Sequence, residues 1–216
     1  MIIEWDGYYT GNAYLSLEQM QVNAKKIYDY YIAKGWTANS ICGMLGNMQR
    51  ESTINPGIWE SLNDYPEGFY EEHGRYPGYG LVQWTPYTIY FDWCTENFLT
   101  SRELPSNLAR IDYELEQDKE NPNSLQWIST VHYPMSFEQF TKSSLRPDTL
   151  ASVFMENYER AGVLAELERQ TNANYWYKYL TGNEPSVDPD DPTPTKPKKK
   201  KGYNFVLFNK KRRIYG

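Results

Sequence analysis

The segment from residue 37 to residue 52 constrains the fold more than any other part of this sequence. Thr37 can cap a helix N-terminus, and apolar residues recur after it at helical spacing, which predicts a helix with one face in the core. Continuing this stripe by three or four residues reaches Glu51 and Ser52, just before the turn-forming Asn55-Pro56-Gly57. An acid therefore occupies a position where the next core residue is expected. The stripe consists of Ile41, Met44, Leu45 and Met48.

The position of Glu51 has two interpretations. A carboxylate at the edge of an apolar face loses solvation, which disfavours its charged form and raises its pKa. A general acid that works near neutral pH needs such a raised pKa. The alternative is a helix-terminal Glu51 whose side chain bends into water, and structural ion pairs perturb carboxylates as well. Spacing alone leaves both interpretations open.

Helical signals dominate the sequence on both sides of one irregular region. Residues 1–15 are rich in Tyr and Gly and are expected to form a loose lead-in. Between residues 55 and 80, Pro, Gly and acids are frequent, which predicts a long loop with short strands, ending in an extended segment at 79–84. We expect a mainly α domain with one irregular insertion. Further helices are expected near 86–98, 108–115, 137–140 and 148–157, and a last one, ending at Gly182, with the buried stripe Leu164, Leu167, Thr171, Tyr175 and Leu180.

The sequence divides into a domain, a linker and a tail. The domain is expected over residues 1–182, and the Pro-, Asp- and Lys-rich residues 183–202 read as an extended linker. Residues 203–216 combine an apolar β-type run with a basic cluster, and they are too short to fold alone. We expect this peptide to add a strand to a partner protein. The alternatives are a remnant of a truncated second domain and a contact with nucleic acid. No nucleic-acid recognition motif accompanies the basic cluster.

The charge distribution bears on the class of partner. Residues 181–216 contain 9 Lys and Arg against 4 Asp and Glu, a net charge of +5, whereas residues 1–180 contain 13 against 24, a net charge of −11. The acidic domain argues against nucleic acid as its substrate and is compatible with a neutral glycan or a mixed-charge wall polymer. No stretch approaches the length of a membrane span, and the N-terminus shows no secretory signal.

Several kinds of catalytic site are disfavoured by the residue types present. His73 and His132 lack metal-ligand spacing, so neither a metal site nor another cofactor is expected. Cys42 lies mid-helix among core residues, a poor place for a nucleophile, and a bridge to Cys94 is left open. No Gly-rich phosphate loop follows a strand. Carboxylates beside aromatic residues remain, and these are the groups that hydrolyse glycosides.

Two segments carry a resemblance to a known family. The run Gly46-Asn47-Met48-Gln49-Arg50-Glu51-Ser52-Thr53-Ile54-Asn55-Pro56-Gly57, followed by Gly78-Tyr79-Gly80-Leu81-Val82-Gln83-Trp84-Thr85, resembles the phage tail lysozyme family, which includes the lysozyme half of podovirus tail-knob proteins. Residues 154–162 and 175–180 resemble its closing helices. The resemblance implies a lysozyme-like (α+β) fold and a peptidoglycan-cleaving activity. It also implies a place at the tip of a virion tail, where the enzyme opens the cell wall during entry.

The resemblance implies roles for particular residues. Glu51 matches the catalytic Glu, which donates a proton to the glycosidic oxygen. Leu81, Val82 and Gln83 match the segment that lines the cleft opposite that acid and binds the sugar. To these we add Tyr79 and Trp84 as stacking surfaces, with the core as the alternative location for both rings.

The second carboxylate is not identified by the resemblance. An inverting enzyme needs a base about 6.5–9.5 Å from the acid, and a retaining enzyme needs a nucleophile about 5–5.5 Å away. Lytic transglycosylases of related fold use a single acid, so the pair is not obligatory. The loop offers Glu60, Asp64 and Glu67, and beyond them Glu71 and Glu72.

Other functions remain compatible with the sequence. One is a wall-binding module of the tail without turnover, and another is a soluble endolysin for host lysis. The tail-knob proteins carry a metallopeptidase domain after their linker, and this sequence lacks one at that place. A separate peptidase, a fragmentary chain and a dispensable peptidase are the three explanations left open. The C-terminal peptide is then expected to dock onto other tail proteins.

Overall fold

The computed structural model describes residues 1–63, 76–123, 125–160 and 165–185. The protein is mostly helical with one small antiparallel sheet, so the predicted mainly α, lysozyme-like (α+β) fold is confirmed. Its elements in chain order are β1 (Ile3–Trp5), β2 (Tyr8–Thr10), α1 (Leu17–Ala33), α2 (Ala38–Ser52), the 3₁₀ turn η1 (Glu60–Leu62), α4 (Thr88–Glu96), α5 (Leu104–Glu120), α6 (Phe137–Lys142), α7 (Pro147–Phe154), the π-helical turn η2 (Met155–Glu159) and α8 (Glu166–Thr181).

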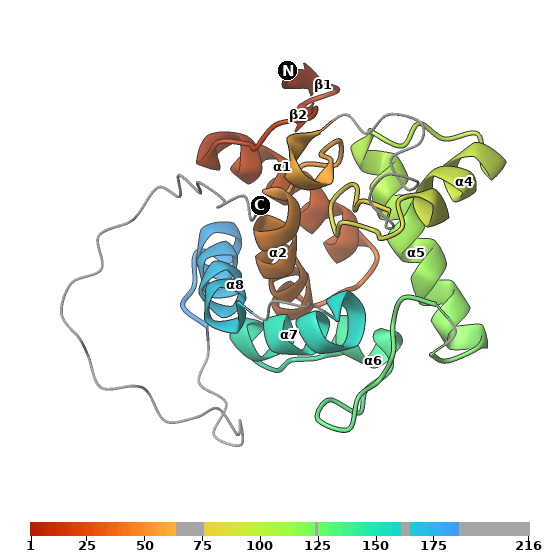
Figure 1. Ribbon diagram of the computed structural model, residues 1–216. Helices are drawn as coiled ribbons and strands as arrows, with labels where there is room; N and C mark the ends of the chain where they lie inside the picture. The colour runs from red at the N-terminus through yellow and green to blue at the C-terminus, as the bar shows by residue number, and fades with distance from the viewer. Residues whose placement is uncertain (64–75, 124, 161–164, 186–216) are drawn as a thin grey trace, which may run out of the picture.

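Helix α2 is the centre of the fold. Figure 1 shows it between the other helices, and its most extensive contacts are with α8 and α7. The Thr37 side chain accepts a hydrogen bond from the Ser40 backbone N–H at 3.1 Å, which is the predicted N-cap. The sequence predicted one buried face, but every residue from Ser40 to Met48 is buried, so this helix is surrounded.

Small residues explain how α2 is enclosed. A Cβ atom added at Gly43 would lie 2.8 Å from the Cβ of Leu150 on α7. A Cβ atom added at Gly46 would lie 2.5 Å from the carbonyl oxygen of Arg169 and 2.9 Å from the Cβ of Ala173, both on α8. The two glycines therefore allow α7 and α8 to approach the α2 backbone more closely than any larger residue would.

The buried face predicted for α8 is correct only in part: Tyr175 and Leu180 are partly buried against the core, but the other described residues of the stripe are not. Leu167 is 73% exposed and Thr171 is exposed, whereas Arg169, Ala173 and Trp176 face the core. The reason is packing against α2, because Gly46 accepts Ala173 and the Arg169 guanidinium finds polar partners on α2. Leu164 of the predicted stripe lies outside the described residues. The predicted end of the helix is confirmed, since α8 is followed by Gly182 in the left-handed conformation.

Three other local expectations change. The lead-in forms the β1–β2 hairpin, which packs on α1 through a hydrogen bond from the Tyr9 N–H to Asn23 Oδ1 at 2.7 Å. Helix α4 begins at Thr88 rather than at Pro86, because the Tyr87 N–H donates to the Pro77 carbonyl oxygen. The helix predicted to run to Asn157 changes at residue 155 into the π-helical turn η2.

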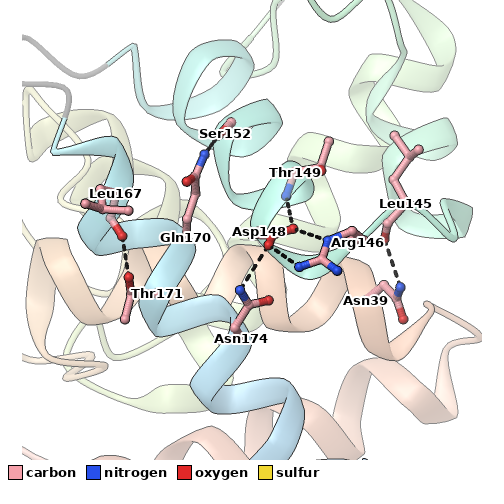
Figure 2. A network of polar contacts seen from close by, with 10 residues as sticks. All are labelled: Asn39, Leu145, Arg146, Asp148, Thr149, Ser152, Leu167, Gln170, Thr171 and Asn174. Atoms are coloured by element: carbon pink, nitrogen blue, oxygen red, sulfur yellow. Dashed lines mark hydrogen bonds and ion pairs between the residues drawn. The ribbon is translucent and has the colours of Figure 1, made fainter. Parts of the chain in front are cut away.

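A polar network fastens the start of α7 to α2 and α8 (Figure 2). Asp148 accepts hydrogen bonds from Arg146 Nη2 at 2.6 Å and from Asn174 Nδ2 of α8 at 3.0 Å. Burial alone would raise the pKa of Asp148, but these hydrogen bonds outweigh it and lower the pKa. Asn39 of α2 donates to the Leu145 carbonyl oxygen at 2.8 Å. These polar contacts link the three helices into one unit. The candidate site lies at the C-terminal end of α2, the end away from Asn39.

Two further observations concern the cysteines and membranes. Cys42 and Cys94, for which a bridge was left open, are both buried and unpaired. Burial raises the pKa of the Cys42 thiol, which makes it a core residue rather than a nucleophile. None of the described helices combines the length and the apolar character that crossing a membrane requires.

The close approach of α8 to α2 gives a stability test. Gly46→Ala should lower the free energy of unfolding by about 1–3 kcal/mol, because the added methyl group would collide with the α8 backbone. In an exposed helix the same change would stabilise by about 1 kcal/mol. Chemical denaturation measures the difference, and a more stable variant would contradict the packing described here.

Candidate active site

Glu51 lies at the C-terminal end of the buried helix α2. Its side chain keeps 23% of its surface exposed, while the residues before Gln49 are buried. The chain leaves the helix at once, because Thr53 adopts the left-handed conformation with φ of 53°. The end of the helix therefore presents a carboxylate at the edge of the core, as the apolar stripe predicted.

A buried arginine holds the Glu51 carboxylate. Arg169 of α8 is only 2% exposed, and its Nη2 donates to Glu51 Oε1 in an ion pair. Its Nη1 donates to Asn47 Oδ1 at 2.8 Å. The Asn47 amide in turn donates to the carbonyl oxygens of Gly43 and Ala151 at 3.0 Å each. Because each group is fixed by the next, the Glu51 carboxylate is held in one orientation.

The segment predicted to lie opposite Glu51 is attached directly to the end of α2. Ser52 Oγ donates to the Leu81 carbonyl oxygen at 2.8 Å, and the Leu81 N–H donates to Asn107 Oδ1 at 3.0 Å. Leu81 and Val82 are buried. The structure therefore brings residue 81 next to the end of α2, and the side chains of Leu81 and Val82 belong to the core.

The other residues predicted to bind the sugar are mostly committed to the fold. Gln83 is partly exposed with φ of 53°, and its Nε2 donates to the Ile58 and Gly80 carbonyl oxygens at 3.2 and 3.0 Å. Tyr79 and Trp84 pair as a β-bridge, so the segment expected to be extended folds back on itself. Both rings are buried, and Trp84 is only 1% exposed. They therefore belong to the core, which was the alternative location for both.

Among the loop carboxylates, Glu60 is the one that lies within the described residues. Glu60 Oε2 accepts a hydrogen bond from the Gly78 N–H at 3.1 Å, a contact that ties the two ends of the loop together. Asp64, Glu67, Glu71 and Glu72 lie outside the described residues.

A second carboxyl group, which the sequence did not single out, interacts electrostatically with Glu51. This is Glu159, the last residue of η2, whose Oε1 is buried and makes no hydrogen bond to the described part of the chain. Burial raises the pKa of Glu159 well above its usual range, and the Glu51 charge raises it further. Arg169 and Arg160 oppose this effect. In the sequence, the available signal was an acid next to Asn157 and Tyr158, two residues that the structure buries. The position of its side chain depends on the π-helical turn.

A second buried acid lies behind the site and is structural. Glu114 of α5 accepts hydrogen bonds from Arg110 Nε at 2.8 Å, from Trp84 Nε1 at 3.0 Å and from the Tyr158 hydroxyl. Burial raises the pKa of Glu114, although these donors oppose it. With its carboxyl oxygens engaged, this residue anchors Trp84 and η2 to α5.

The described residues thus offer acid–base chemistry by carboxyl groups. They contain no group of three or more His, Cys, Asp or Glu side chains that could hold a metal ion. The parts of the site are a partly exposed Glu51, an arginine that fixes it and a second carboxyl group, Glu159, with one buried oxygen. Such a set can donate a proton to a bound oxygen atom and stabilise a positive charge that develops beside it.

Comparison with known proteins decides the family. The family model for phage tail lysozyme matches residues 22–180, which include Glu51, Glu159 and Arg169. The chain belongs to the phage tail lysozyme family. The resemblance drawn from the motifs around residues 46–57 and 78–85 is confirmed by this match.

A curated relative is also similar to this phage tail lysozyme. Morphogenesis protein 1 of Bacillus phage B103 is 46% identical over 175 residues, a region that covers 81% of this chain. The same region covers 44% of the relative, so the chain spans less than half of that protein's length. The similarity supports a lysozyme-like protein of a bacteriophage.

The raised pKa of Glu159 has a consequence for stability. In the pH range above 4.5, the ordinary value for Glu, the folded protein binds a proton that the unfolded chain has released. The contribution of Glu159 to the free energy of unfolding is therefore full below pH 4.5, and it falls as the pH rises towards the pKa of Glu159 in the folded protein. Glu159→Gln removes this dependence, so its free energy of unfolding relative to wild type should increase between pH 4.5 and neutral pH. Denaturation at several pH values measures it, and a constant difference between the two proteins would contradict the assignment.

Proposed function

We propose that this protein hydrolyses β-1,4 bonds of the glycan strands of bacterial peptidoglycan, with Glu51 as the general acid. The observation that carries the proposal is the position of Glu51 itself. It is a partly exposed carboxyl group at the end of a buried helix, held by Arg169 and adjacent to the segment at Leu81. Family membership supplies the substrate class, because a lysozyme acts on peptidoglycan.

The proposed reaction makes two proton transfers. Glu51 donates its proton to the glycosidic oxygen, the bond from the anomeric carbon to that oxygen breaks, and its electron pair stays with the leaving sugar. Water then adds to the anomeric carbon, and one of its protons returns to Glu51. The Arg169 guanidinium stabilises the Glu51 carboxylate that forms. Whether the wall product carries an anhydro sugar distinguishes a transglycosylase from a hydrolase.

Glu51→Gln tests the role of the acid. The variant should clear purified Gram-positive cell walls about 100-fold more slowly or worse, because general acid catalysis contributes about 10²–10⁴ in rate. The matched control is Glu168→Gln, a more exposed acid on α8 that pairs with the neighbouring Arg50. Turbidity loss gives the rate, and mass spectrometry of the fragments shows which bond is cut. Equal clearing by wild type and Glu51→Gln would refute the assignment, and no clearing by wild type would favour the adhesion module.

We further propose that the protein is a component of the phage tail that acts on the host wall during entry. The family description and the phage origin of the relative support a virion-associated protein. The C-terminal peptide 203–216 is proposed to dock onto other tail proteins. Its β-type run and basic cluster are the sequence features that support this.

Deletion of residues 203–216 tests the docking proposal. Wall clearing by the purified variant should match wild type, because the site lies wholly within the described domain. Incorporation into virions should be lost, as measured by immunoblotting of purified particles. Normal incorporation would sink the docking proposal, and absence of the wild-type protein from particles would favour the endolysin instead.

A further inference from the structure

A surface hollow of about 440 Å³ lies between the β1–β2 hairpin and the connection from α4 to α5. Thr10 of the hairpin, Trp59 of the segment after α2 and Arg102 of the connection contribute to its walls. Neither Glu51 nor Arg169 is among the described residues that line it. Its volume falls in the range of pockets that bind small molecules. The hollow is therefore a candidate ligand site that the proposed reaction does not use.

The walls of this hollow are fastened to one another. The Thr10 hydroxyl donates to the Arg102 carbonyl oxygen at 2.7 Å, and Asn12 Oδ1 accepts a hydrogen bond from the Trp59 N–H at 3.1 Å. A Cβ atom added at Gly57 would lie 2.4 Å from Thr10 Oγ1, so the hairpin and the turn after α2 are in direct contact. Walls that are already ordered lower the entropic cost of binding a ligand.

Trp59 supplies an aromatic surface to the hollow. Its ring is partly exposed and packs against Tyr79, Tyr87 and Phe91, with centroid distances of 4.6, 5.0 and 5.4 Å. Trp59 also forms a β-bridge with Tyr79, whose own ring is buried. A tryptophan ring held in one orientation and partly open to water can pack against the apolar C–H face of a sugar.

Arg102 supplies a positive charge to the same hollow. Its side chain is exposed, and in the part of the chain that the structure describes no carboxylate lies within ion-pair distance of its guanidinium. This is notable in a domain whose residues 1–180 carry a net charge of −11. A guanidinium matches the geometry of a carboxylate and binds it with two parallel hydrogen bonds. The hollow thus combines a surface for a sugar ring with a group for an anion.

We propose that this hollow binds a muramyl-peptide unit of peptidoglycan, with Trp59 against the sugar ring and Arg102 on a carboxylate of the attached stem peptide. The inference rests on the proposed function, which supplies peptidoglycan as the ligand class. Of the two alternating sugars of the glycan strand, only the muramyl sugar carries the peptide, so the guanidinium distinguishes this sugar from its neighbour. The hollow then holds the wall polymer at a second place, separate from the residues that position Glu51.

The test is an NMR titration of the full-length protein with N-acetylmuramyl-L-alanyl-D-isoglutamine. The matched ligand is the same compound with its carboxylate converted to an amide. The carboxylate form should shift the indole N–H signal of Trp59, which is assigned by its loss in Trp59→Phe. Arg102→Ala should weaken binding of the carboxylate form by about three- to tenfold, because an exposed charge-assisted hydrogen bond is lost. The amide form should bind wild type and Arg102→Ala equally weakly.

The control variant is Lys25→Gln. Lys25 is an exposed cation on α1 that pairs with Asp29 and does not line the hollow, so this variant should bind the carboxylate form as wild type does.

Three results would overturn the inference. These are an unshifted Trp59 signal, equal affinity of wild type for the carboxylate and amide forms, and undiminished binding by Arg102→Ala. If Trp59→Phe fails to fold, sequential backbone assignment identifies the indole signal, and Arg102→Ala, at an exposed position, still decides. The proposed function fails separately, because neither ligand contains a β-1,4 bond and the titration does not depend on cleavage by Glu51.

Discussion

The buried guanidinium of Arg169 is the interaction on which the site depends. It joins α8 to α2 through Asn47 and fixes Glu51 at the end of the same helix. A charge with 2% exposure is tolerated only when it is paired and hydrogen-bonded, so the packing of two helices and the orientation of one carboxylate are a single arrangement. Removing the Glu51 carboxylate would take a charged acceptor away from a buried guanidinium, which costs more than losing an exposed ion pair.

The core makes this interaction available. Gly43 and Gly46 let α7 and α8 approach the backbone of α2, and only this close approach brings Arg169 within reach of Asn47. The polar network at Asp148 fixes the start of α7 (Figure 2), and η2 follows α7 directly in the chain. The polar network holds the start of α7 beside the N-terminal end of α2, where Asn39 lies, and the two glycines let α7 and α8 pack along the middle of α2. Glu51 lies at the opposite, C-terminal end of the same helix.

Some of this could be predicted from the sequence and some could not. The stripe from Ile41 to Met48 predicted α2 and the unusual position of Glu51, because helical periodicity is a local signal. The buried face of α8 was predicted only in part, because it depends on a contact between Gly46 and Ala173 that no periodicity reveals. Leu167 is exposed and Arg169 is buried, the reverse of what hydropathy favours. Glu159 was missed for a related reason, since the π-helical turn that orients it is set by tertiary packing. For Tyr79 and Trp84 the error is the opposite one. They were proposed as stacking surfaces because they flank a motif, and both are part of the core.

The central electrostatic claim is that burial raises the pKa of Glu159, so that this carboxyl group keeps its proton above the pH at which an ordinary glutamate loses it. The most direct measurement is a ¹³C NMR titration of the glutamate side-chain carboxyl groups, with the Glu159 signal assigned by its loss in Glu159→Gln. The account predicts that this signal keeps the chemical shift of a protonated acid well above pH 4.5, the ordinary value for Glu. A Glu159 signal that titrates near 4.5 would contradict it.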